Sequence, residues 1–266
     1  LIGGSRLDRS YQKPGEYKAM EGLEHFLPLV NGFNLVFGPV IAAIFRIFGR
    51  EVQDPYHLIP DYIVMSIVVV ILLSIFLGLL GRRLRLIPFK TQVVLEAIID
   101  FFEGVIDETI GMQGRKYLPL VASVGLFILT ANLLGLIPGF MSPTSKLNVT
   151  LGCALVVWLY YHWQGIKNLG LFGYLKHFTG ANPFLAPLLL PIEIISHLSR
   201  PISLSMRLFG NIFSEELLIL IMLSIIPYLL PLPFMAIAIF TAVIQAYVFV
   251  LLTCIYLAGA IEEEQE

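Results

Sequence analysis

The chain has 266 residues, of which 57% are hydrophobic and only 14% are charged, and its mean hydropathy is +0.84. Soluble domains carry about 25% charged residues, so this composition excludes an ordinary soluble protein and predicts an all-α polytopic membrane protein. The net charge of −2 gives no indication of nucleic-acid binding. Cys153 and Cys254 both lie in apolar segments, where we interpret them as small hydrophobic residues rather than as a disulfide or a metal site.

The N-terminal part, residues 1–57, is predicted to form an outer-side segment at the membrane interface. Its first 20 residues are polar. The apolar run Phe33–Phe48 is interrupted by Gly38 and Pro39 and contains Arg46. A span needs about 20 apolar residues, so this run is predicted to lie in the interface rather than to cross the membrane.

Three apolar segments of sufficient length follow, at about 61–81, 118–138 and 147–167. The third contains His162 within an aromatic cluster typical of the membrane boundary, so we interpret this histidine as interfacial rather than as a proton carrier. Between the first two, residues 91–112 are predicted to form an amphipathic cytoplasmic helix. Its acidic stripe is interpreted as a solvated face rather than a cation site, and consists of Glu96, Asp100, Glu103 and Asp107.

Basic residues predict the orientation. Between the first two spans the chain contains Arg82, Arg83, Arg85, Lys90, Arg115 and Lys116, and Lys167 and Lys176 follow the third span. The loop between the second and third spans contains only Lys146. Because short cytoplasmic loops are enriched in Lys and Arg, residues 81–117 and 167–182 are predicted to be cytoplasmic and the N-terminus to be outside. The tail, 262–266, then lies in the cytoplasm.

Two long helices are predicted at 183–226 and 232–261, which completes five spans in one membrane domain, 58–261. Asn182-Pro183 is a helix-start signal, and Pro227, Pro231 and Pro233 separate the pair. The helical pattern from Ile192 to Ile226 is about 52 Å long, whereas the bilayer core is about 30 Å thick. Both helices are therefore predicted to tilt strongly and to form a hairpin.

A polar stripe follows the first long helix at steps of three and four residues, with a kink expected at Pro201 near His197. It comprises Glu193, Ser196 or His197, Arg200, Ser203, Arg207, Asn211 and Ser214. Arg207 is flanked only by apolar and small residues, and a charge in hydrocarbon costs about 2.5–3.5 kcal/mol on insertion scales. Arginine does not release its proton, so Arg207 is interpreted as a fixed countercharge to a carboxylate of another subunit.

The run Arg207-Leu208-Phe209-Gly210-Asn211 resembles the signature of subunit a of the F-type ATP synthase. Other matching segments are Ala131–Gly139, Leu147–Leu151, Pro191–Glu193 and Gln245–Phe249, and the resemblance extends from about residue 58 to 260.

This resemblance implies the stator subunit of the F0 motor, with two proton half-channels that meet a rotating c-ring and couple proton flow to ATP synthesis or hydrolysis. Arg207 would face the ring carboxylate. Asn211, Glu216 and Gln245 match positions near the outer half-channel and the arginine. Glu193 matches the cytoplasmic half-channel, with Ser196 and Ser203 nearby.

The sequence also departs from the family pattern. Many bacterial members have a histidine where this chain has Ala238, and Glu215 is the expected substitute titrating group. His197 is expected either to bond to a neighbouring helix or to contribute to proton translocation. The pattern is not mitochondrial, which implies a bacterial inner membrane. Implied partners are the c-ring, the peripheral-stalk b subunits, the rest of the F1F0 complex and lipid; no cofactor is expected.

The alternative is a stand-alone ion-coupled secondary transporter or channel. Such proteins commonly contain inverted repeats, and this sequence has no visible internal repeat. It also lacks a GxxxxGK[ST] phosphate-binding loop, so the chain is expected not to be an enzyme by itself.

Overall fold

The computed structural model describes residues 28–47, 59–81, 90–137, 140–179, 186–226 and 229–261. Within these ranges the secondary structure is helical, with no β-strand. The chain divides into two compact units, Leu1–Ile59 and Pro60–Glu266. The predicted all-α class is confirmed.

The first unit contains α2, Pro28–Ile47. This helix continues through Pro39, although Gly38 and Pro39 interrupt the apolar run of the sequence there. Asn34 is buried, its amide oxygen accepts the backbone N–H of Ile59 at 3.1 Å, and its Nδ2 donates to the carbonyl of Ile59 at 3.2 Å. This pair of bonds fixes the end of the first unit to α2. The polar residues 1–27 lie outside the described residues.

The second unit contains six α-helices and two short 3₁₀ helices among its described residues. In chain order these are α3 (Asp61–Gly81), α4 (Lys90–Thr109), η2 (Met112–Tyr117), α5 (Leu118–Gly135), η3 (Pro143–Ser145), α6 (Leu147–Thr179), α7 (Ala186–Ile225) and α8 (Pro231–Ile261).

Four segments of the described residues are long and apolar enough to cross a membrane: Asp61–Gly81, Met112–Gly135, Pro187–Ile225 and Pro231–Ile261. This supports a polytopic membrane protein, with one candidate fewer than the five spans predicted. The remaining range, 147–167, is helical as part of α6 but is not among the four. Its tryptophans, tyrosines and histidine make it less apolar than the other segments.

The helix α6 changes direction at Gly170, where φ is 73° and ψ is 163°. Side chains with a Cβ rarely adopt such a positive φ, so a glycine is needed at this position. The bend folds the C-terminal part of α6 back. As a result, Tyr174 lies so close to Gly165 that a Cβ atom added to this glycine would collide with its ring. In a straight helix these two residues would be about 13 Å apart along the axis.

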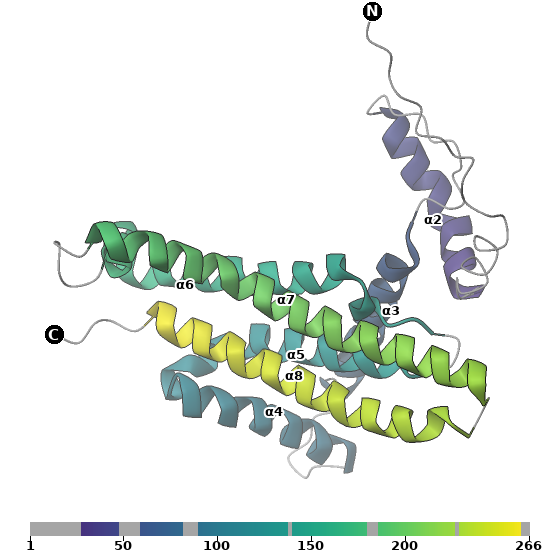
Figure 1. The fold of residues 1–266 in the computed structure, drawn as a ribbon. Coiled ribbons are helices and arrows are strands. Elements are labelled where there is room, and N and C mark those ends of the chain that lie inside the picture. The colour runs from purple at the N-terminus through teal and green to yellow at the C-terminus, as the bar shows by residue number, and fades with distance from the viewer. Residues whose placement is uncertain are drawn as a thin grey trace, which may run out of the picture. The chain divides into compact units, whose positions relative to one another are not determined.

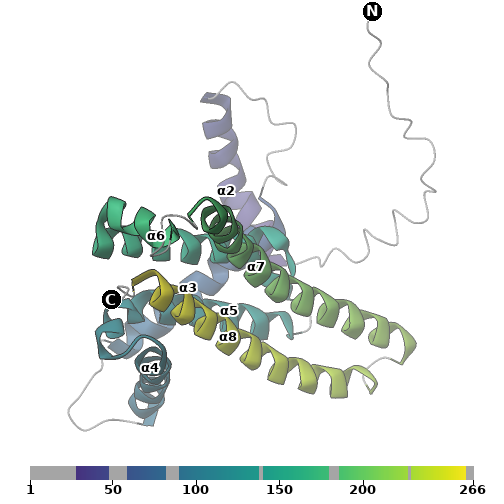
Figure 2. The ribbon, with the colours of Figure 1, turned by 60° about the vertical axis from the view of Figure 1, so that its left-hand side comes forward.

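The hairpin of α7 and α8 is the longest feature of the second unit, and the two helices run alongside each other in both views (Figure 1, Figure 2). The helix α7 has 40 residues, about 60 Å, and contains Pro191 and Pro201. The helix α8 also packs against α4, α5 and α6. The largest fully buried side chains of the hairpin are Leu208, Phe249 and Leu257, so α8 lies at the centre of the packed unit.

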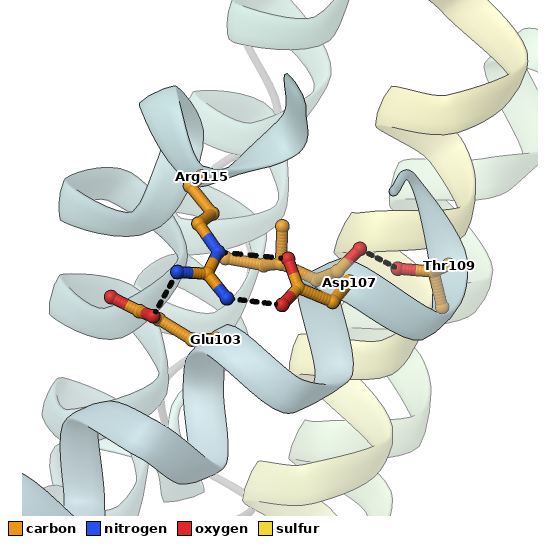
Figure 3. A network of polar contacts seen from close by, with 5 residues as sticks. Glu103, Asp107, Thr109 and Arg115 are labelled. Carbon is orange, nitrogen blue, oxygen red and sulfur yellow. Dashed lines mark hydrogen bonds and ion pairs between the residues drawn. The ribbon is translucent and has the colours of Figure 1, made fainter. Parts of the chain in front are cut away.

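Arg115 joins η2 to the acidic face of α4 (Figure 3). Its Nη1 lies 2.9 Å from Glu103, and its Nε and Nη2 donate to the two oxygens of Asp107 at 3.0 and 2.6 Å. The predicted solvated stripe therefore has two of its four carboxylates paired with one guanidinium. These hydrogen bonds lower the pKa of Asp107.

Candidate functional site

The central part of α7 presents polar side chains on its open face. Ser203, Arg207, Asn211 and Ser214 are exposed, at spacings of three and four residues. The opposite face is apolar and buried, and includes Leu204, Leu208 and Ile212. The predicted polar stripe thus forms a surface of the isolated chain along this part of the helix.

Arg207 lies on this open face beside exposed apolar side chains, of which Ile202 is 57% and Met206 52% exposed. It forms no ion pair within the part of the chain that the structure describes. A charged group next to such an apolar surface is expensive in a membrane unless it acquires a partner or water. Arg207 is therefore a cation whose side chain is accessible to a partner outside the described residues.

Among the described residues, three contacts of polar or charged side chains connect α7 to α8. Asn211 Nδ2 donates to Gln245 Oε1 at 2.9 Å. One turn further along α7, Glu215 lies beside the hydroxyl of Thr241. At the other end, the guanidinium of Arg200 lies 5.0 Å from the ring centroid of Tyr256.

These contacts share one antiparallel register. Each advance of four or eleven residues along α7 is matched by an equal and opposite advance along α8. Gln245 is buried although Asn211 is exposed, so the hydrogen bond between their side chains runs from the open face into the hairpin. The structure thus brings the predicted residues Asn211 and Gln245 together.

A second polar group lies where α6 crosses the N-terminal half of α7. Nε2 of His197 is 3.2 Å from the carboxylate of Glu193, and Nδ1 is 3.0 Å from the hydroxyl of Tyr161. The imidazole is buried and so is Tyr161, whereas Glu193 is partly exposed. His197 therefore has both ring nitrogens engaged, one by its own helix and one by α6.

The backbone of His197 is also held by α6. The indole Nε1–H of Trp158 donates to the His197 carbonyl at 2.9 Å. In an α-helix this carbonyl would accept the N–H four residues on, but that residue is Pro201, which has none. Trp158 replaces the missing bond, which explains how α7 accommodates a proline in its interior.

His162 and Tyr174 complete the α6 side of this cluster. Nδ1 of His162 lies 2.6 Å from the Tyr174 hydroxyl, and its ring centroid is 5.1 Å from that of His197. The bend at Gly170 makes the contact with Tyr174 possible. Sequence reasoning placed His162 in an aromatic belt and did not connect it with His197, because 35 residues separate them.

The other predicted residues are placed more simply. Ser196 is partly buried, and its carbonyl accepts the hydroxyl of Ser199 at 2.7 Å. Glu215 and Glu216 are both partly buried near the C-terminal end of α7. Ala238, at the position where the family pattern has a histidine, is only 2% exposed, so it is closely packed by its neighbours.

Sequence reasoning missed a buried polar cluster between α5 and η3. Asn132 Oδ1 accepts the hydroxyl of Thr144 at 2.6 Å, and Thr144 and Ser142 hydroxyls are 2.7 Å apart. The Nδ2 of Asn132 is buried without a hydrogen-bond partner among the described residues. An asparagine within an apolar span was the available signal. The segment η3 packs against α3, α5, α6 and α7.

The fold and these contacts define an all-helical, multi-pass membrane protein with ionisable groups on its longest helix. Comparison with known proteins gives the family. Residues 62–258 match the family model described as ATP synthase A chain.

Curated relatives agree with this match. The chain is 45% identical over 223 residues to ATP synthase subunit a 1 of Pelobacter propionicus, which covers 83% of this chain and 97% of that protein. It is 44% identical to ATP synthase subunit a of Sulfurihydrogenibium sp., over 76% of this chain and 97% of that protein. For the subunit a of Campylobacter fetus the values are 46%, 77% and 92%. The chain belongs to the family of subunit a of the F-type ATP synthase.

Proposed function

We propose that this chain is the stator subunit of a proton-driven rotary motor, in which Arg207 is the fixed countercharge to a carboxylate on a rotating c-ring. The observation that carries the proposal is the exposed, unpaired state of Arg207 within the described residues, on an otherwise apolar membrane helix. A passing carboxylate would supply the missing partner. Arginine stays charged at working pH, so it favours the ionised carboxylate and repels a proton moving directly between the two sides.

The polar groups on either side of Arg207 would form two half-channels. Asn211, Glu215, Glu216 and Gln245 form the outer set, and the Asn211–Gln245 bond supports a connected polar path there. Glu193, Ser196, His197 and Ser203 form the cytoplasmic set, and the Glu193–His197 contact supports it. A proton enters one set, neutralises the ring carboxylate, and leaves through the other after rotation.

The proposal extends to the surroundings of the chain. The N-terminus lies outside and the C-terminus in the cytoplasm of a bacterial inner membrane, and the membrane domain comprises residues 58–261. The partners are the c-ring, the b subunits of the peripheral stalk and the remainder of the F1F0 complex, with lipid around them. The chain itself is non-catalytic and couples proton flow to ATP synthesis or hydrolysis elsewhere in the complex.

The test is Arg207→Ala in the assembled complex, in inverted membrane vesicles, with ATP-driven proton pumping and passive proton leak measured together. Pumping is expected to fall at least 100-fold while the complex still assembles. Met206→Ala is the matched control, because Met206 is an exposed neighbour without charge. Pumping near the wild-type rate in Arg207→Ala would show that the countercharge role is wrong.

The competing function is a stand-alone transporter or channel. It predicts that the purified chain conducts protons in vesicles without a c-ring. Our proposal expects no conduction by the chain alone and restored, ATP-coupled pumping when the whole complex is reconstituted.

A further inference from the structure

We propose that His197 exchanges a proton with Glu193, and that Tyr161 of α6 is a positioning residue that holds the imidazole for this exchange. The inference rests on the proposed role of Glu193 in the cytoplasmic half-channel. It adds a residue from α6, outside the two long helices, to the proton path.

Glu193, His197 and Tyr161 are increasingly buried in this order, from the accessible carboxylate inwards. The side chain of Glu193 is 38% exposed, whereas that of His197 is 7% exposed. Tyr161 lies behind His197 and is almost completely buried. The carboxylate is thus the accessible member of the group, and the imidazole is a proton acceptor placed directly behind it.

The distances permit a direct transfer. A protonated Glu193 gives its proton to Nε2 of His197 across the 3.2 Å contact, so the O–H bond breaks as the N–H bond forms. The products are a carboxylate and an imidazolium, and no other reactant is needed. The reverse step returns the proton to Glu193.

Tyr161 can serve both protonation states of His197. When the imidazole is neutral and accepts at Nε2, its proton is on Nδ1, which donates to the Tyr161 hydroxyl oxygen. When the imidazolium carries a proton on both nitrogens, the same oxygen still accepts Nδ1–H. The second bond is charge-assisted and is the stronger of the two, so Tyr161 favours the imidazolium.

The titratable and charged groups around the His197 imidazole have opposing effects on its protonation. Glu193 stabilises the imidazolium. Arg200 of α7, over the rings of Tyr161 and Tyr256 at 5.9 and 5.0 Å, disfavours it. His162, whose ring lies 5.1 Å away and is bonded to Tyr174, disfavours it when protonated. The protonation of the pair is therefore expected to depend on the pH at the cytoplasmic face.

Trp158 supports the same geometry through the backbone, because its bond to the His197 carbonyl fixes the part of α7 from which the imidazole projects. The helix α6 thus holds His197 at two points, the carbonyl and Nδ1. Both points depend on packing between α6 and α7, which the structure shows directly.

The experiment uses the assembled complex in inverted vesicles, where the medium contacts the cytoplasmic face. The initial rate of ATP-driven proton pumping is measured against medium pH for wild type, Tyr161→Phe and Tyr160→Phe. Tyr161→Phe removes the hydroxyl on His197 and keeps the ring, and is expected to move the midpoint of the profile by about half to one unit towards lower pH. Tyr160→Phe makes the same change one residue away and is expected to leave the profile unchanged.

His197→Gln is the second variant. Glutamine can still form hydrogen bonds but cannot take up a proton, so pumping is expected to fall about tenfold or more and the pH-dependent limb to disappear. If Tyr161→Phe does not assemble, this variant decides the question. A wild-type rate and profile in His197→Gln, or a wild-type midpoint in Tyr161→Phe, overturns the inference.

The two proposals fail in different ways. Arg207→Ala vesicles that still pump would contradict the proposed function. Vesicles that lose pumping in Arg207→Ala and keep a wild-type pH profile in Tyr161→Phe and His197→Gln would contradict only the role of His197 and Tyr161.

Discussion

The polar side chains in two stretches of α7 have opposite surroundings. Around His197, the helix is covered by α6, and the ring and backbone of this residue are bonded by Glu193, Tyr161 and Trp158. Three turns further on, Arg207 lies on an open face, without an ion pair in the described part of the chain. The first stretch finds its partners within the chain, whereas the second is left incomplete.

This difference distinguishes side chains that are held by the chain itself from a side chain that is left available to a partner. A membrane helix with an ionisable group is stable when that group has a partner, and the stretch around His197 satisfies this condition internally. Arg207 would satisfy it through another subunit, which is what a stator facing a moving ring requires. A rigid internal partner for Arg207 would compete with each arriving carboxylate.

The largest difference in stability is expected between substitutions at two adjacent residues of α7. Leu208 is fully buried, whereas its neighbour Arg207 is exposed. Leu208→Ala is expected to destabilise the fold by about 2–5 kcal/mol because it leaves a cavity, whereas Arg207→Ala changes stability by only about 0.5 kcal/mol. Thermal denaturation of the purified chain in detergent measures both. Equal losses in the two variants would show that Arg207 is a structural residue.

A smaller effect is expected at Trp158. Trp158→Phe leaves the His197 carbonyl without its donor and is expected to cost about 1–3 kcal/mol in the same assay. Trp163→Phe is the control, because Trp163 is on the same helix and is 67% exposed. Adding Pro201→Ala to Trp158→Phe restores a backbone N–H at position 201 and should recover part of the loss. An unchanged loss in the double variant would rule out this explanation of the bond.

The connection across the hairpin can be measured by a double-mutant cycle of Asn211→Ala and Gln245→Ala. Hydrogen bonds between membrane helices contribute about 0.6 kcal/mol on average, so a coupling energy of this size is expected. Asn211 with Thr253 is the control pair, because Thr253 is two turns further along α8 and bonds to the carbonyl of Phe249. Zero coupling between Asn211 and Gln245 would contradict the contact.

The smallest effect concerns the exposed clamp of Arg115. Its bonds lower the pKa of Asp107, so this carboxyl contributes stability above its ordinary pKa near 3.9 and loses that contribution as the pH falls through the lowered value. A carboxyl NMR titration of Asp107 in wild type and Arg115→Gln measures the shift. The variant is expected to titrate at higher pH than wild type; identical titrations would exclude the clamp as its cause.

Several features were accessible from local sequence. Apolar runs of membrane length predicted the helices, since the periodicity and length of a helix depend on neighbouring residues. Arg207 was identified because it is a charge among apolar residues, and its surrounding motif resembled one family. The kink at Gly170 and the continuous path of α2 through Pro39 were not predicted, because whether a glycine or a proline breaks a helix depends on what packs against it.

What the sequence by itself determined was therefore the helical class, the two long helices and the identity of the unusual charges. Only the tertiary structure decided which charges are paired within the chain. The bond between Trp158 and His197 joins residues 39 positions apart, and the contacts of Asn211 with Gln245 and of Arg115 with α4 also depend on packing. Polar stripes record which side chains share a helix face, but the partner of each face is chosen by the packing of helices distant in the chain.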